Sequence, residues 1–279
     1  MNVLRCGGFS INSNLSLGSI NRIDVSNFEV DVFPAMLVGR HACNVVRLKG
    51  DIYVFGGRDG NSITVRSVEK CTLTTTNHWN KIAEMPHLES FCACAFVDKI
   101  FILGGVSSIG GFTNACLQFD TNNYKFKNLA GMIEARFYAA CAIFEGKLVV
   151  SGGLDNNYNN LHTVESYDVT GDASWTRMPS MTKARSAHSL VVVRNKLFVM
   201  GSGSNACEVY TTNTGKFVAL KSPALTFNKS LQVAGKVFVF QNNKAFVLVY
   251  DVEGEVWSEK ECDATKYIIS FFCAKMPSY

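Results

Sequence analysis

Five histidines are the residues of this 279-residue sequence best suited to acid, base or metal-binding chemistry. They are His41, His78, His87, His162 and His188. No His-x-His or comparable ligand spacing joins them, so they do not outline a metal site. Neither a GxSxG nucleophile motif nor a phosphate-binding loop accompanies them. We therefore expect no enzymatic activity, no metal ion and no cofactor.

Ten cysteines are the other reactive side chains of the chain. No two of them form a Cys-x-x-Cys pair, and the close neighbours Cys92 and Cys94 have no histidine nearby. Five lie in segments rich in small residues and are interpreted as small buried hydrophobic residues, namely Cys43, Cys92, Cys94, Cys141 and Cys273. The first ten residues contain no signal-peptide hydrophobic core, so we expect a reducing, cytoplasmic location.

The composition favours one soluble domain with an ordinary surface. Hydrophobic residues make up 47% of the chain, which is enough to bury a substantial core. The net charge of +4 arises from 27 basic and 23 acidic residues without a run of five like charges. This balance implies neither a nucleic acid nor a membrane as partner. No apolar stretch approaches the roughly 18 residues that a membrane helix needs.

A repeated glycine position organises the chain. Apolar segments such as IYVFGG, IFILGG and LVVSGG each end in a glycine pair. The first glycines of the repeats are Gly7, Gly56, Gly104, Gly152 and Gly201, at intervals of 48 or 49 residues. A further copy, VFVFQN, places Gln241 at this position after a shorter interval of 40 residues. The period of about 50 residues indicates six repeated units.

Two further columns recur at the same period. Six residues before the first glycine stand residues that tolerate a positive φ, and they predict tight hairpin turns: Gly50, Asp98, Gly146, Asn195 and Gly235. Downstream, one aromatic residue opens a short strand in each unit: Phe28, Trp79, Tyr124, Trp175, Phe217 and Trp257. One large aromatic side chain per unit suits packing between adjacent sheets. Each unit is therefore predicted to form four strands.

These columns predict an all-β, six-bladed propeller with four antiparallel strands per blade. We expect a single domain over residues 1–279, whose blades span 1–36 plus 265–276, 37–86, 87–133, 134–181, 182–223 and 224–264. The first unit begins at its hairpin turn and lacks an inner strand, whereas 265–276 stands where an inner strand is due. We expect this C-terminal strand to close the first blade, which removes exposed sheet edges.

The glycine pairs, the VESYD stretch ending at Asp168, the spaced Trp175 and the segment MPSMTKARSAH resemble Kelch repeats of the BTB-Kelch type. The resemblance covers the whole chain and implies a protein-protein interaction module. Similar proteins are substrate-recognition subunits of cullin-RING ubiquitin ligases, and an alternative role in this group is actin or cytoskeleton binding. Cullin would bind only through a BTB domain, which this sequence lacks. A stand-alone propeller, an isolated domain and an incomplete gene product therefore remain alternatives.

A cationic column is the first candidate for partner binding. Ten residues before each hairpin turn stand Arg40, Leu88, Arg136, Arg185, Leu225 and Lys266. Around a ring, Arg40, Arg136, Arg185 and Lys266 would form a basic collar at the channel mouth. Such a collar suits an acidic or phosphorylated protein or peptide. The alternative is that these arginines bond backbone groups between blades.

The loops after the glycine pairs are the second candidate. They contribute Arg58, Asn61, Phe112, Asn157 and Tyr158, which we expect to contact a partner. Phe112 and Tyr158 are the best anchors, because an exposed aromatic side chain offers a large contact area at a small entropic cost. The alternative is that either ring folds back onto its own blade. Glycines such as Gly60, Gly110 and Gly111 are interpreted as turn residues.

Overall fold

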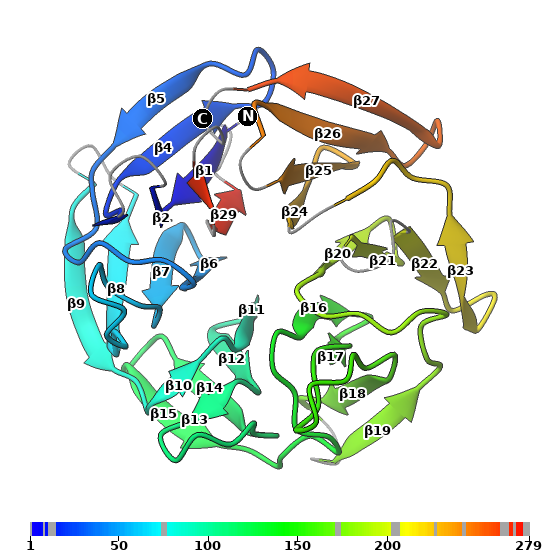
Figure 1. Cartoon of the computed structure of the whole chain (residues 1–279), viewed down its shortest axis with the longest axis horizontal. Helices are drawn as coiled ribbons and strands as arrows, with labels where there is room; N and C mark the ends of the chain where they lie inside the picture. Colours follow the sequence, from blue (N-terminus) through cyan, green and yellow to red (C-terminus); the bar gives the residue numbers. More distant parts are fainter. Residues whose placement is uncertain are drawn as a thin grey trace.

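Antiparallel sheets stand around a common axis in a ring, as the computed structural model in Figure 1 shows. The structure describes residues 2–7, 9–10, 15–73, 77–170, 174–201, 207–225, 228–241, 244–262, 268–269 and 272–275. None of these residues belongs to a helix long and apolar enough to span a bilayer. The all-β propeller architecture expected from the repeats is confirmed.

Five blades are each built from one continuous stretch of chain, with the strands in sequence order from the axis outward. The first of them contains β6 (Asn44–Leu48), β7 (Asp51–Phe55), β8 (Ser67–Thr72) and β9 (Trp79–Glu84). The second contains β11 (Cys92–Phe96), β12 (Lys99–Leu103), β14 (Cys116–Asp120) and β15 (Lys125–Asn128). The third contains β16 (Ala140–Phe144), β17 (Lys147–Ser151), β18 (Val164–Asp168) and β19 (Trp175–Met178). The fourth contains β20 (Ser189–Val193), β21 (Lys196–Met200), β22 (Cys207–Thr211) and β23 (Lys216–Leu220). The fifth contains β24 (Asn228–Val233), β25 (Lys236–Gln241), β26 (Phe246–Asp251) and β27 (Val256–Glu261).

The remaining four-stranded sheet is composite and joins the two ends of the chain. It contains β29 (Phe272–Lys275), β1 (Asn2–Cys6), β4 (Ile20–Asp24) and β5 (Val30–Phe33), in that order. The expected count of six blades is therefore corrected to five blades of continuous chain plus this composite sheet. The reason lies in the strand order, because β1 pairs with β4 on one edge and with the distant β29 on the other.

Short strands in the loops also depart from the expected four strands per unit. β10 (Leu88–Glu89) pairs with β13 (Val106–Ser107), and β2 (Phe9–Ser10) pairs with both β28 (Ile268–Ile269) and β3 (Leu15–Ser16). These pairings join loop segments that lie outside the four-stranded sheets. The loops of the ring are thus partly ordered by backbone hydrogen bonds of their own.

The hairpin turns form where the sequence predicts them. Leu48 lies opposite Asp51, so Lys49 and Gly50 form a two-residue turn. Both residues have positive φ, at 50° and 88°, which is the backbone of a type I′ turn. The tight turns set the register, and the register decides which side chains of each strand face the neighbouring blade.

The glycine pairs allow neighbouring blades to approach closely. Gly104 has a φ of 65°, and a Cβ atom at this position would lie 2.3 Å from the carbonyl oxygen of Arg136 in the segment leading to the next blade. The adjacent Gly105 donates its backbone N–H to the same oxygen at 2.7 Å. A residue larger than glycine would push these two segments apart, which explains why glycine recurs at this position.

Aromatic side chains fill the spaces between blades. Phe55 of β7 and Phe119 of β14 meet edge to face with ring centroids 5.3 Å apart. The aromatic residue that opens an outer strand also anchors the preceding segment, since Trp79 Nε1 and Trp175 Nε1 donate to Pro34 O and Ala130 O, both at 2.9 Å. The core therefore lies between the blades and not along the axis.

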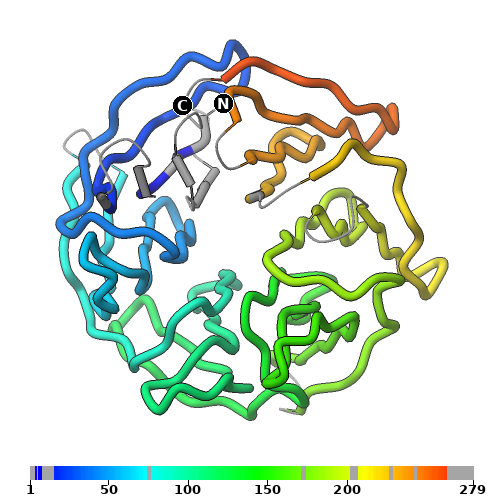
Figure 2. Tube along the Cα trace, viewed as in Figure 1, coloured from blue at the N-terminus to red at the C-terminus, as the bar shows by residue number. Residues whose placement is uncertain are grey.

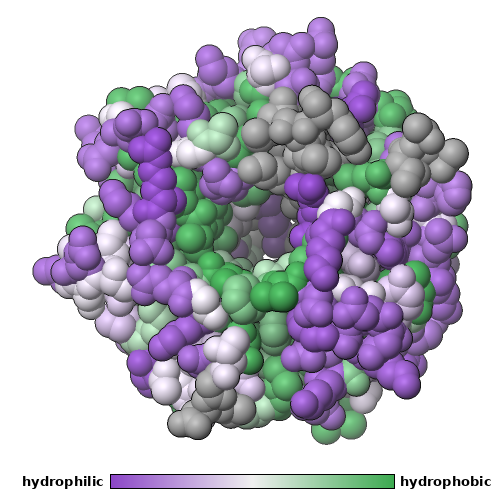
Figure 3. Space-filling model, turned by 180° about the vertical axis from the view of Figure 1, so that it is seen from behind, coloured by the Kyte–Doolittle hydropathy of each residue, from purple (hydrophilic) through white to green (hydrophobic). Residues whose placement is uncertain are grey.

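The strand order places two kinds of loop on the same face of the ring. Each antiparallel strand reverses direction, so the loop after the second strand and the segment leading from the fourth strand to the next blade share one face. Figure 2 shows the chain returning from each outer strand to the next inner strand. The hairpin turns lie on the opposite face. Viewed from behind, the ring has a central hollow with hydrophobic residues along part of its rim (Figure 3).

Candidate functional site

The three arginines of the cationic column are buried. Arg40, Arg136 and Arg185 each have a relative exposure of 0%. Since no partner can reach a guanidinium group in this position, the expectation of an exposed basic collar is wrong for these residues. The fourth member, Lys266, lies outside the described residues.

Each buried arginine forms an ion pair with a buried glutamate from the third strand of its own blade. Arg136 Nη2 lies 2.7 Å from Glu165 Oε1 of β18. Arg40 pairs with Glu69 of β8 in the same way, and Arg185 pairs with Glu208 of β22. A charged side chain that is removed from water requires a partner of opposite charge, because an unpaired buried charge strongly destabilises the folded state.

Arg136 illustrates how this pair joins two blades. Its Nη1 donates to the carbonyl oxygens of Gly152 at 2.8 Å and Thr163 at 3.1 Å within its own blade. Its own carbonyl accepts the N–H of Gly105 from the preceding blade. The alternative stated for these arginines is therefore met in part: the Arg136 side chain bonds backbone groups, but within its own blade, and the contact between blades is made by the Arg136 backbone carbonyl.

The paired glutamates also hold the segment that leads into their blade. Glu165 accepts the backbone N–H groups of Ile133 at 2.6 Å and Glu134 at 3.1 Å. Glu69 accepts from Leu37 at 2.8 Å, and Glu208 accepts from Thr182 at 2.7 Å. The Arg and Glu pair is thus a structural joint of the loop face.

Leucine replaces both members of the pair in the other two continuous blades. Where the column holds Leu88, the third strand carries Leu117, and where it holds Leu225, the third strand carries Leu248. Leu88 and Leu117 belong to one hydrophobic cluster, and Leu225 and Leu248 belong to another. The joint is therefore ionic in three blades and apolar in two.

The glutamates are functional parts of the structure that the sequence analysis missed. The signal was present in the chain, since a third-strand glutamate accompanies each arginine and a third-strand leucine accompanies each leucine. A column-by-column comparison of the repeats would have linked the two positions. Such a link would also have favoured the structural interpretation of the arginines.

Arg58 and Asn61 lie in the loop between β7 and β8. The Arg58 side chain is 43% exposed and forms an ion pair with Glu89 of the next blade. Thr64 also donates a hydrogen bond to Glu89. Burial raises the pKa of the Glu89 carboxyl group, but the bonds from Thr64 and Arg58 outweigh this effect, so the pKa is lowered from its ordinary value. Asn61 is exposed, and its backbone N–H is bound by Asp59 Oδ1 at 2.9 Å. Arg58 is therefore held in place, whereas the Asn61 side chain reaches the surface.

Phe112 and Tyr158 meet on the loop face with Phe137 and Tyr138, and we name these four residues the aromatic cluster. Phe112 stacks on Phe137 with centroids 4.8 Å apart and meets Tyr158 edge to face at 5.2 Å. Phe137 and Tyr138 are 3.9 Å apart. The members come from the loops of two adjacent blades. Such pairs hold aromatic rings in a defined arrangement.

The aromatic cluster is open to solvent at its outer edge. Tyr158 is 71% exposed and Tyr138 is 42% exposed, whereas Phe112 is half-buried beneath them. Ile109, in the same loop as Phe112, is 93% exposed. Asn157 is exposed beside Tyr158, and its backbone N–H binds Asp155 Oδ1 at 2.8 Å. Phe112 packs on Phe137 of the adjacent blade and not on its own blade, and Tyr158 projects outward.

His188, His41 and Cys43 occupy structural positions. His188 is buried, its Nε2 lies 2.8 Å from Ser151 Oγ, and burial lowers its pKa to about 3. His41 Nδ1 lies 2.7 Å from Ser16 Oγ. Burial raises the pKa of the Cys43 thiol to about 11, which disfavours the reactive thiolate. Within the described ranges, no group of three or more His, Cys, Asp or Glu residues could hold a metal ion.

The chain was compared with known protein families and with curated proteins. The family model described as the KLHDC2/KLHL20/DRC7 Kelch-repeats domain matches residues 7–214. Similar proteins include an F-box/kelch-repeat protein of Arabidopsis thaliana, 28% identical over 57% of this chain and 45% of that protein. Kelch-like protein 38 of Danio rerio is 33% identical over 47% of this chain and 22% of its own length.

Kelch-like protein 23 of Homo sapiens is 28% identical over 52% of this chain and 25% of its own length. The aligned parts of these three relatives are all less than half of their length. The resemblance to Kelch repeats that the sequence motifs indicated is confirmed by the match and by these relatives.

Proposed function

Because the chain belongs to the family of Kelch-repeat proteins, whose propellers are generally non-enzymatic modules that bind protein partners, we propose that it captures its partner on the aromatic cluster and the adjacent Ile109. The observation that carries the proposal is the outward projection of Tyr158 and Ile109 from a rigid loop face. Exposed aromatic and aliphatic residues on such a scaffold are typical binding anchors.

The chemistry of this face favours an apolar segment of the partner. Arg40, Arg136 and Arg185 already have carboxylate partners in the interior. Arg58, a further cation of these loops, is paired with Glu89. An acidic or phosphorylated partner would therefore lack the arginine collar that the sequence suggested. A partner helix or strand with one or two exposed apolar side chains matches Tyr158, Tyr138 and Ile109 better.

We further propose that the partner is a substrate of a ubiquitin ligase and that the propeller is its recognition part. Support comes from the resemblance to BTB-Kelch propellers and from relatives that are named as F-box/kelch-repeat and BTB-containing Kelch proteins. A cullin would be recruited through a BTB domain or a comparable adaptor domain and not through the propeller itself. The cytoplasm is the expected compartment for this role.

An affinity purification tests the binding face. The intact chain, a Tyr158→Ser/Ile109→Ser variant and a Val32→Ser/Val256→Ser control are purified with their partners from the same cell lysate. The control positions are exposed valines on outer strands, at 88% and 59% exposure, so the chemical change is comparable. Proteins that disappear only with the loop variant would be partners of the aromatic cluster.

Two other outcomes separate the alternatives. Partners lost equally with the control variant, or retained by both variants, would contradict binding at the aromatic cluster. Recovery of a cullin or of a BTB or F-box protein supports the ligase proposal. The loop variant would lose such a protein only if the substrate connects it to the propeller. Co-sedimentation with actin filaments that persists in the loop variant would instead favour the cytoskeletal alternative.

A further inference from the structure

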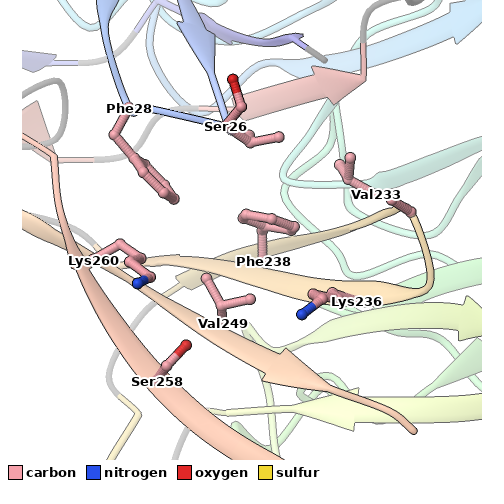
Figure 4. A pocket seen from close by; sticks show the side chains of 10 residues that line it. Ser26, Phe28, Val233, Lys236, Phe238, Val249, Ser258 and Lys260 are labelled. Carbon is pink, nitrogen blue, oxygen red and sulfur yellow. The ribbon is translucent and has the colours of Figure 1, made fainter.

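A pocket opens at the seam where the composite sheet meets the last blade. Its volume is about 350 Å³. Figure 4 shows Phe28 of the composite sheet and Phe238 and Val249 of the last blade facing the same space. Val25 and Ser26 belong to the turn between β4 and β5, so the pocket lies on the face of the hairpin turns. This is the face opposite the aromatic cluster.

The pocket lies where the composite sheet has no aromatic side chain in its third strand. Four of the five continuous blades carry Phe119, Tyr167, Tyr210 or Tyr250 at this position, which packs on the preceding blade, and the fifth carries Cys71. Tyr250, for example, meets Phe198 with centroids 6.0 Å apart. The equivalent residue of the composite sheet is Ile23, which is fully buried against the last blade. An isoleucine fills less of this space than a tyrosine ring.

Phe28 lines the vacant space. The residue that corresponds to Trp257 is Val30, because Val30 lies opposite Ile23 as Trp257 lies opposite Tyr250, on which it packs with ring centroids 4.9 Å apart. Phe28 lies in the turn between β4 and β5, and its ring centroid lies 6.3 Å from that of Phe238 across the seam. The two rings and Val249 form apolar walls into which a hydrocarbon group of a ligand can fit.

Two lysines stand at the opening of this apolar pocket. Lys236 and Lys260 line it on either side of Val249 (Figure 4). Lys236 is bound by Asp251 at 2.7 Å. In the described part of the chain, no carboxylate lies within ion-pair distance of Lys260. The opening is therefore positively charged beside apolar walls.

We propose that this seam pocket binds a small apolar carboxylate, with the hydrocarbon part between Phe28 and Phe238 and the carboxylate paired with Lys260. An aromatic or branched aliphatic acid has the required size and charge. The same chemistry is present in a free metabolite and in the C-terminal residue of a peptide chain. The pocket lies on the other face from the proposed partner surface, so the two proposals can fail independently.

Isothermal titration of the intact chain tests this site with three probes. 3-Phenylpropionate carries the ring and the carboxylate, 3-phenylpropionamide is its neutral analogue, and N-acetyl-glycyl-phenylalanine presents a C-terminal phenylalanine. We expect the acid to bind about tenfold more tightly than the amide, because a charge-assisted bond to Lys260 is lost with the amide. Tighter binding of the dipeptide than of the acid would identify a peptide C-terminus as the ligand, and the reverse a free acid.

Three variants assign the binding to the pocket. Lys260→Met should weaken binding of the acid about tenfold and leave the amide unchanged. Ser258→Trp introduces a ring from an exposed lining position and should abolish binding of all probes. Lys216→Met removes an exposed lysine from the neighbouring blade, away from the pocket, and should change nothing.

The proposal would be overturned by equal binding of acid and amide, by undiminished binding to the Ser258→Trp variant, or by absence of binding to the intact chain at about 10 mM probe. Thermal unfolding of each variant is measured alongside. Because Ser258 and Lys260 are exposed residues of the outer strand β27, we expect the unfolding temperatures to match that of the intact chain.

Discussion

The ionic and the apolar joints of the ring perform the same task with opposite chemistry. In the blade of β16 to β19, buried Arg136 and Glu165 connect the incoming segment to the third strand. In the blade of β11 to β15, Leu88 and Leu117 occupy the same two positions. The fold therefore tolerates either a paired charge or a hydrophobic contact, provided that both positions agree.

The segment that leads into the blade also differs between these two blades. In the ionic blade Met132 is followed by Ile133, whose N–H is bound by Glu165 at 2.6 Å. In the apolar blade Met85 is followed by Pro86, which has no N–H to satisfy. In this blade the carboxylate acceptor and the N–H donor are both absent. In the blade of Leu225 the equivalent residue is Ser222, which keeps its N–H, so acceptor and donor are lost together in one of the two apolar blades.

Breaking the ionic joint at one position should have the largest effect. The Arg136→Leu variant leaves Glu165 buried without its cation, and we expect a loss of about 3–5 kcal/mol in the free energy of unfolding. Urea unfolding followed by circular dichroism measures the loss. Lys147→Leu, at an exposed position of the same blade, is the control. A loss below about 1 kcal/mol would mean that the pair does not hold the blade.

Converting the joint completely should recover much of that loss. In an Arg136→Leu/Glu165→Leu variant both charges are absent, as in the blade of Leu88 and Leu117. We expect recovery of about 2–3 kcal/mol relative to the single variant. Recovery should remain incomplete, because the amides of Ile133 and Glu134 lose their acceptor. A double variant that is less stable than the single one would contradict the equivalence of the two joints.

A buried histidine adds a pH dependence to the ionic joint of Arg185. Burial lowers the pKa of His188 to about 3 in the folded chain, so the unfolded chain binds a proton first as the pH falls through 6.5. Stability should therefore decrease on acidification, by about 2 kcal/mol between pH 7 and pH 5 from this group. A His188→Gln variant should show a shallower decrease in urea titrations. Equal slopes would show that His188 does not titrate on unfolding in this range.

The stabilisation by the tryptophan hydrogen bonds should not depend on whether the joint of the blade is ionic or apolar. Trp175 donates to Ala130 O in an ionic blade, and Trp257 donates to Lys221 O in an apolar blade, both at 2.9 Å. Each Trp→Phe variant should lose about 1 kcal/mol for one hydrogen bond, and less where water reaches the group, as at Trp257. A much larger loss at Trp175 alone would show that its anchor is coupled to the Arg136 pair.

The smallest effect on stability is expected on the loop face. Tyr158 is exposed and contacts Phe112 through its edge, so Tyr158→Ser should change the free energy of unfolding by no more than about 0.5 kcal/mol. The same variant is expected to reduce partner binding. A large loss of stability would mean that the aromatic cluster is a structural joint like those of the arginines.

Local features of the fold were predictable from the sequence, and features of the site were only partly so. The hairpin at Gly50 and the glycine pair at Gly104 follow from local backbone requirements that recur in every unit. The outward position of Tyr158 was predicted as one of two alternatives. A structural role of Arg136 was likewise one of two alternatives, but its partner Glu165, which lies 29 residues away, was not predicted.

The sequence by itself determined the period, the turns, the strand alternation and the family, because each depends on residue type at fixed short spacing. Only the tertiary structure decided that Arg136 is buried against Glu165 and that a pocket opens beside Ile23. These are contacts between segments far apart in the chain. Their energy depends on burial and on the partner that the fold brings close, and neither is encoded in the spacing of neighbouring residues.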